Sequence, residues 1–156
     1  MKNFYLLIFI LSFLIPCDDG YESFMENCYF SSDVDFLREI LENSIETVNM
    51  DMDDPNWFST TSTGNGNGMI EPLEICSQTW EEGRLISLDC GAHELNGVYH
   101  WCQLSGNLPE SLINLTELET LILDYNDFSG FIPEYICTLD FDFSDFSMFS
   151  LNGNNF

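Results

Sequence analysis

Residues 104–127 read LSGNLPESLINLTELETLILDYND, and residues 128–139 continue as FSGFIPEYICTL. The Leu-Ser-Gly that begins the first stretch returns 24 residues later as Phe-Ser-Gly, and Pro109 returns as Pro133. A fixed period of this length, kept at glycine and proline as well as at apolar positions, indicates one structural unit that is copied and stacked. A βαβ domain that merely contained leucine-rich elements would not explain the repeated Gly and Pro.

The apolar residues of the unit follow the frame L-x-x-L-x-L-x-x-N, which is complete from Leu118 to Asn126. The same spacing occurs from Leu85 to His93 and from Phe146 to Asn154. The paired leucines are expected to alternate inward on a short strand. The side chains of His93, Asn126 and Asn154 are expected to form a structural ladder that satisfies backbone groups inside each bend.

This frame resembles the plant-type extracellular leucine-rich repeat, because L-x-G-x-[IL]-P occurs at 104–109 and FSGFIP at 128–133. The resemblance implies an α/β fold, a short right-handed solenoid of about three turns over residues 84–156. It also implies a helical, disulfide-containing N-terminal cap over residues 18–83. Such repeats occur in the ectodomains of receptor-like kinases and receptor-like proteins and in polygalacturonase inhibitors, so the resemblance implies protein or peptide recognition.

The cap is expected to contain a helix over about 33–48, where apolar residues recur at helical spacing, and a Gly/Asn-rich loop at 60–70. Six cysteines allow fifteen pairings, and Cys76–Cys90 or Cys90–Cys102 could staple the cap. No two cysteines are spaced C-x-x-C, which disfavours zinc.

Residues 1–17 are predicted to be a signal peptide, because Lys2 precedes an apolar run over 4–15. The protein is therefore expected to be secreted or to lie on the extracellular side of the plasma membrane. The sequence stops at Phe156, where another L-x-G-x-[IL]-P would begin. We therefore expect the repeats to be truncated there, although another subunit could cover the open end. Any membrane contact would be made by segments that this chain does not contain.

The formal net charge of −24 arises from 27 acidic residues against three basic ones. This balance argues against nucleic acid and anionic membrane surfaces, which require Lys and Arg. It suits a cationic extracellular protein or peptide, or divalent cations. The simpler interpretation is that the acidity serves solubility alone.

The stretch TGNGNGMIEPLE at 63–74 resembles the calcium loop of an EF-hand in Thr63, Asn65, Asn67 and Glu74. Thr63 stands where that loop has Asp, which leaves few carboxylates. A surface loop without metal is the favoured interpretation, Ca²⁺ is the minority hypothesis, and no other cofactor is expected.

Catalytic signatures such as G-x-S-x-G, H-E-x-x-H and a phosphate loop are absent from the sequence, so an enzyme is not expected. A concave strand face is predicted to bind partners instead, and Asn114 of the N-L-T sequon is a predicted glycosylation site. An acidic structural protein that uses calcium to associate is the alternative. The predicted binding residues are Ser87, Asp89, Glu119, Thr120, Ile122, Asp124, Tyr125, Ser147, Met148, Ser150 and Asn152.

Overall fold

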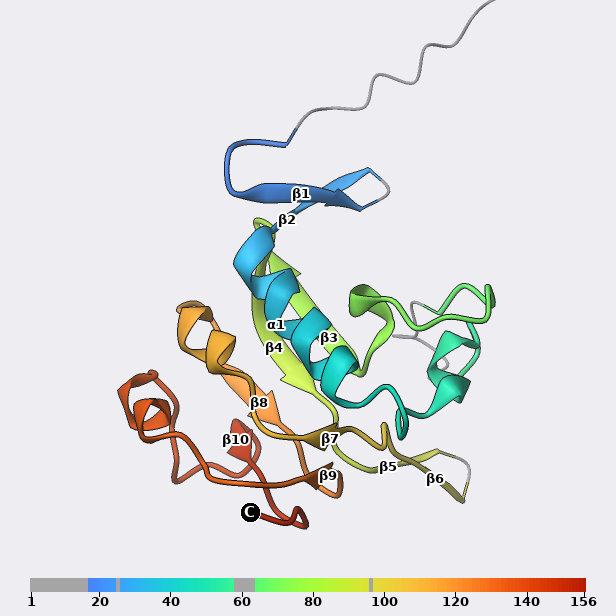
Figure 1. The fold of residues 1–156 in the computed structure, drawn as a ribbon, viewed down its shortest axis with the longest axis vertical. Helices are drawn as coiled ribbons and strands as arrows, with labels where there is room; N and C mark the ends of the chain where they lie inside the picture. The colour runs from blue at the N-terminus through green and yellow to red at the C-terminus, as the bar shows by residue number, and fades with distance from the viewer. Residues whose placement is uncertain (1–16, 25, 58–63, 96) are drawn as a thin grey trace, which may run out of the picture.

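The structure is a computed structural model that describes residues 17–24, 26–57, 64–95 and 97–156 (Figure 1). One α-helix, four short 3-10 helices and ten strands make up this part of the chain. In chain order they are β1 (Tyr21–Phe24), β2 (Asn27–Phe30), α1 (Ser31–Asn43), η1 (Met50–Asp53), η2 (Pro72–Glu74), β3 (Ser77–Glu81), β4 (Arg84–Asp89), β5 (His93–Leu95), β6 (Val98–His100), β7 (Ser105–Gly106), η3 (Glu110–Asn114), β8 (Thr120–Ile122), β9 (Asp127–Phe128), η4 (Glu134–Thr138) and β10 (Phe149–Ser150).

The main sheet has the strand order β10-β8-β4-β3, with β4, β8 and β10 parallel and β3 antiparallel at the cap end. Leu88 of β4 lies opposite Leu121 of β8, which in turn lies opposite Phe149 of β10. Leu88 and Leu121 are fully buried. Equivalent residues of successive frames therefore stack across the sheet and form one continuous core.

The two prolines of the 24-residue echo each precede a 3-10 helix. Pro109 has φ −63° before η3 and Pro133 has φ −64° before η4, the angle that the proline ring imposes. Leu112 and Ile136, the central apolar residues of these helices, are both buried. β7 comes shortly before η3 in the chain and β9 shortly before η4, and these two strands pair in parallel with Gly106 opposite Phe128 (Figure 1).

Helix α1 is shorter than the predicted helix at 33–48, since it begins at Ser31 and ends at Asn43. Ser44 ends it with φ −103° and ψ 6°. Its buried hydroxyl accepts a hydrogen bond from the Ser105 backbone N–H at 2.8 Å. This tertiary bond fixes a bend that helical periodicity alone could not indicate.

Helix α1 is joined to the first repeat strand by a buried ion pair. Arg84, at the start of β4, donates from Nε to Asp33 Oδ2 at 2.8 Å and from Nη2 to Oδ1 at 3.2 Å. The Leu85 backbone N–H donates to the same Oδ2 at 2.9 Å. Asp33 is fully buried, and the guanidinium lies 4.3 Å from the centre of the Phe30 ring. The cap is therefore held on the sheet by a charge pair as well as by apolar contacts.

The last copy of the frame differs from the other two at its first position. Phe146 is exposed where Leu85 and Leu118 are buried. Phe141 is buried instead and packs against Phe149 with ring centres 5.1 Å apart. This copy is four residues longer than the 24-residue period, and Asp142 and Asp145 form turns with Ser144 and Ser147. The inserted turns carry Phe146 outward, and Phe141 fills the core.

Cys17 and Cys28 form a disulfide that closes the chain onto the β1–β2 hairpin. Residues 1–16, which hold most of the predicted signal peptide, lie outside the described residues. A cut after Cys17, at the predicted boundary of the signal peptide, would remove one of the two sulfur atoms of this disulfide. Any leader cleavage that leaves this bond intact has to fall before Cys17.

Candidate recognition face

Outward side chains of neighbouring strands stand in rows across the main sheet. Ser87 lies opposite Thr120, and Asp89 lies opposite Ile122, which lies opposite Ser150. Because β4 and β8 are parallel and in register, residues from two copies of the frame form one surface. The third copy adds Asn152, whose backbone is hydrogen-bonded to Asp124 and Tyr125.

Most of the predicted binding residues are accessible on this surface, and one is not. Glu119, Tyr125, Ser147 and Asn152 are exposed, and Ser87, Asp89, Thr120, Ile122, Asp124 and Met148 are half-buried. Ser150 is buried, and its hydroxyl accepts a hydrogen bond from Asn152 Nδ2 at 2.7 Å. Ser150 is therefore corrected from a contact residue to a support for Asn152.

Tyr125 is the largest side chain presented by this face, with 66% of its surface exposed. It adopts φ +55°, and its N–H donates to the Asn152 carbonyl at 2.8 Å. A Cβ on Gly153 would lie 2.8 Å from the Tyr125 ring and would clash with it. The absence of a side chain at Gly153 therefore allows the ring to occupy this position. Asp124 accepts from the Asn152 N–H at 2.7 Å. The aromatic anchor is thus held between two successive copies.

The second half of the chain, residues 85–156, carries acidic residues without any Lys or Arg to balance them. Residues 85–156 contain eleven Asp and Glu and neither Lys nor Arg. Asp89, Glu119 and Asp124 carry this charge on the face itself. The surface is electrostatically suited to a partner that carries Lys or Arg.

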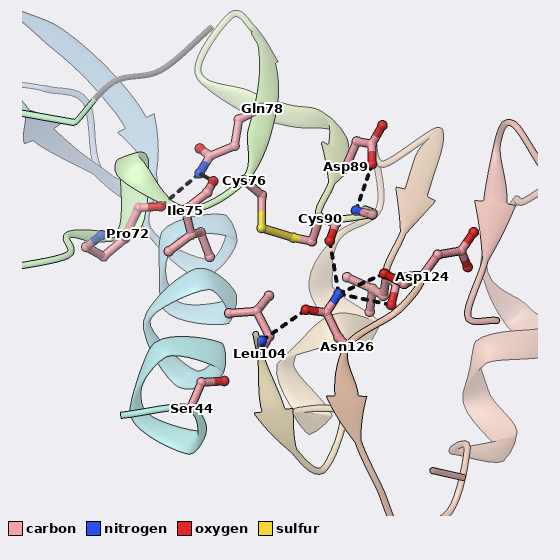
Figure 2. The surroundings of a disulfide bond; sticks show 12 residues. Ser44, Pro72, Ile75, Cys76, Gln78, Asp89, Cys90, Leu104, Asp124 and Asn126 are labelled. Atoms are coloured by element: carbon pink, nitrogen blue, oxygen red, sulfur yellow. Dashed lines mark hydrogen bonds between the residues drawn. A yellow bond between two sulfur atoms is a disulfide. The ribbon is translucent and has the colours of Figure 1, made fainter. Parts of the chain in front are cut away.

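Asn126 supplies the hydrogen bonds that the predicted ladder requires. Its Nδ2 donates to the carbonyls of Cys90 at 2.9 Å and of Leu123 and Asp124 at 3.2 Å each. Its Oδ1 accepts from the Leu104 N–H at 2.9 Å (Figure 2). One buried amide thus joins three separate stretches of backbone.

Asn154 repeats this pattern in the next copy, and His93 does not. Asn154 donates to Leu123 O at 2.8 Å and accepts from the Phe128 N–H at 3.0 Å. His93 instead lies in the β5–β6 hairpin, with Nε2 3.1 Å from Asp89 Oδ1. The ladder prediction for His93 is corrected: the chain leaves the repeat path at this hairpin, and Asn126 reaches Cys90 O.

The start of the face is fixed by the Cys76–Cys90 disulfide, which links the residue before β3 to the residue after β4 (Figure 2). The alternative Cys90–Cys102 pairing is not the one observed, although all three sulfur atoms lie within 4.8 Å of one another. Closing a loop of this length stabilises a folded chain by about 3 kcal/mol. Because two of the three sulfur atoms are in a disulfide, this cluster is not a set of free thiolates for a metal.

Cys102 and Cys137 are free thiols that should differ sharply in reactivity. Cys102 is buried and Cys137 is exposed. Burial raises the pKa of the Cys102 thiol to about 12, so almost none of it is thiolate at pH 8. Iodoacetamide at pH 8 should therefore modify Cys137 and spare Cys102 until guanidinium is added. Peptide mass spectrometry would check this, and equal labelling of both, or a Cys90–Cys102 peptide, would contradict the structure.

The described residues of the predicted calcium loop belong to the cap segment before β3 and not to the strands of this face. Thr63 is outside the described residues, while Asn65 and Asn67 are exposed and Glu74 is buried. Asp53, which the sequence did not indicate, accepts hydrogen bonds from this loop. The sequence signal that could have found it is the Asp-Asp pair just before the Gly/Asn-rich run. Asn114 is exposed, as a glycan acceptor has to be.

Within the residues that the structure describes, no helix is both long enough and apolar enough to cross a bilayer.

Parallel strands on a leucine core, joined by asparagine amides, are the features that the leucine-rich repeat frame predicts. Comparison with known proteins supports this class. The chain is 38% identical over 88 residues to a probable LRR receptor-like serine/threonine-protein kinase of Arabidopsis thaliana. This confirms the resemblance to plant leucine-rich repeat receptors. The match covers 55% of the chain and 13% of the relative.

A solved structure with similarity to the chain is the BIR3–SERK2 complex from Arabidopsis thaliana, at 28% identity and a TM-score of 0.42. That match covers 78% of this chain and 56% of the other. No family profile matches the chain.

Proposed function

We propose that this chain is a recognition module of leucine-rich repeats whose main sheet forms a concave face for an extracellular protein or peptide. The observation that carries the proposal is the parallel register of β4 and β8, which places side chains from two copies on one surface. Asn152 of the third copy is hydrogen-bonded to Asp124 and Tyr125 beside them. A rigid surface with an aromatic anchor is the type of site that binds proteins. The likeness to a receptor-like kinase supports the same role.

The rest of the proposal concerns the partner and the compartment. The wholly acidic second half of the chain favours a cationic ligand, and the role proposed for the face is binding. Disulfides support an oxidising, extracellular setting. In that setting Asn114 would carry a glycan, and residues 84–156 would form a short right-handed solenoid.

A peptide array tests the proposal directly. The purified chain should bind basic peptides in preference to neutral ones of the same length, and the binding should weaken as salt rises from about 0.05 to 0.5 M. Tyr125→Ala should weaken binding by about tenfold, because truncating an aromatic anchor costs more than 1 kcal/mol. Glu119→Gln should weaken it less and reduce its dependence on salt.

The matched control is Tyr99→Ala, since Tyr99 on β6 is 60% exposed but lies outside the main sheet. This variant should bind like the original chain. The face would be rejected as the binding site if Tyr99→Ala and Tyr125→Ala lowered the peptide affinity equally. It would also be rejected if the affinity depended neither on Tyr125 nor on the salt concentration.

A further inference from the structure

The loop that follows the undescribed residues 58–63 is folded by its own side-chain oxygens. Asn65 Oδ1 accepts from the Asn67 N–H at 3.0 Å, and Asn67 Oδ1 accepts from the Met69 N–H at 2.8 Å. Gly68 has φ +88°, and Ile70, two residues further, packs against the core. Alternating side-chain oxygens, a glycine at position six and an apolar residue at position eight are the arrangement of a twelve-residue calcium loop.

Asp53 lies across this loop although it is more than ten residues away in the chain. Its Oδ1 accepts from the N–H groups of Gly66 at 2.8 Å and Asn67 at 3.2 Å, and its Oδ2 accepts from Gly68 at 2.7 Å. A Cβ on Gly64 would lie 2.5 Å from the Asp53 carbonyl, so glycine lets the two segments touch. A carboxylate from outside the loop thus contacts it, whereas Thr63, the first residue of the motif in the sequence, has no carboxylate to offer.

Glu74 occupies the twelfth position of the calcium-loop motif, and the hydrogen bonds of the protein do not fully explain its burial. Only 5% of it is exposed, and its Oε2 accepts from the Glu71 N–H at 2.8 Å. Its Oε1 is buried and has no hydrogen-bond partner among the described residues. Burial raises the pKa of Glu74, with the charges of Glu71 and Asp53 adding to the effect. A buried carboxylate oxygen without a partner is costly, and a bound cation would satisfy it.

We propose that this cap loop binds Ca²⁺ through the side chains of Asp53, Asn65, Asn67 and Glu74, with Asp53 supplied from η1 in place of the loop's first residue. Ca²⁺ suits this set better than Mg²⁺, because it accepts amide and carboxylate oxygens in flexible geometry. Glu71 lies at the ninth position, and its Oε2 accepts a hydrogen bond from Asn65 Nδ2 at 3.0 Å. Among the described residues, no three carboxylates lie within 4.8 Å of one another. The amide oxygens of Asn65 and Asn67 are therefore needed to complete the set of calcium ligands. The affinity therefore belongs in the range of extracellular sites, about 0.1–1 mM.

The experiment titrates the purified full chain with CaCl₂, and separately with MgCl₂, by calorimetry and by thermal unfolding. One Ca²⁺ should bind per chain, raise the melting temperature and protect the amides of 66–69 from hydrogen exchange, with a smaller response to Mg²⁺. Glu74→Gln should keep or raise the melting temperature without metal, since it removes an unpartnered buried charge. The same variant should weaken Ca²⁺ binding about tenfold or more.

Asp53→Asn should also weaken Ca²⁺ binding, and Asp51→Asn is its matched control. Asp51 lies two residues earlier in η1 and is exposed. The Asp51→Asn variant should bind Ca²⁺ as tightly as the original chain does. Equal responses to Ca²⁺ and Mg²⁺ that persist in Glu74→Gln would show general screening of an acidic surface, and the absence of any response at 10 mM Ca²⁺ would also overturn the proposal.

Discussion

Replacing Arg84 with methionine should lower the free energy of unfolding by about 3–5 kcal/mol, because it leaves the buried Asp33 carboxylate without its ion-pair partner. Asp33 is fully buried, and the Arg84 side chain is only 18% exposed. The hydrogen bond to Asp33 raises the pKa of the Arg84 guanidinium. Among the residues that the structure describes, the Leu85 N–H would be the only remaining donor to the carboxylate. Urea unfolding followed by circular dichroism would measure the loss.

Arg38→Met is the matched control for this prediction. Arg38 pairs with Glu22 and Asp35, but its side chain is 40% exposed. Exposed ion pairs contribute about 0–1 kcal/mol, so this variant should be nearly as stable as the original chain. Arg84→Lys should fall between the two, because an ammonium cannot make the paired contact. If Arg84→Met and Arg38→Met cost the same, the buried pair would not be what joins the cap to the sheet.

Asn126→Ala should lower the free energy of unfolding by about 3 kcal/mol, the second of the two large effects. The substitution leaves the Cys90 carbonyl and the Leu104 N–H without the partner that Asn126 provides. Each buried backbone group left unpaired costs about 1–3 kcal/mol. The Leu104 amide should also exchange with solvent faster, which hydrogen-exchange mass spectrometry would detect. Asn126→Asp tests the amide itself, because a carboxylate cannot donate to the carbonyls.

Asn154→Ala gives the internal comparison for Asn126. Asn154 makes equivalent bonds in the next copy, but it is half-buried near the end of the described sheet. Water can replace part of its hydrogen bonding, so the loss should be about 1 kcal/mol. A larger loss for Asn154 than for Asn126 would mean that the ladder is most important at the C-terminal end rather than beside the cap.

The proposed Ca²⁺ binding and the proposed recognition of a protein or peptide concern different parts of the chain. The proposed Ca²⁺ ligands belong to η1, η2 and the loop before η2, whereas the proposed binding face belongs to β4, β8 and β10. Ca²⁺ binding could therefore be present without peptide binding, and the reverse. The Tyr125 and Glu74 variants separate the two outcomes.

What the sequence by itself determined is the repeating unit. The 24-residue echo predicted two equivalent turns, found as η3 and η4, and the frame predicted the buried leucines of β4 and β8. These features follow from local rules, since proline fixes its own φ and alternating side chains fall on opposite faces of a strand. The same rules failed where a copy changes length, at Phe146, and where the chain leaves the repeat path, at His93.

Only the tertiary structure decided the pairings between distant residues. Asp33 and Arg84 are 51 residues apart, and Asp53 reaches a loop 13 to 15 residues away. Helix α1 ends at Asn43, and the hydroxyl of the next residue, Ser44, accepts a hydrogen bond from Ser105. Cys90 pairs with Cys76 although the Cys102 sulfur lies within 4.8 Å of both sulfur atoms. The periodicity of a sequence predicts which face of its own strand or helix a residue occupies. It does not predict which charged group, amide or sulfur atom contacts that face in the folded protein, because those contacts depend on how the whole chain packs.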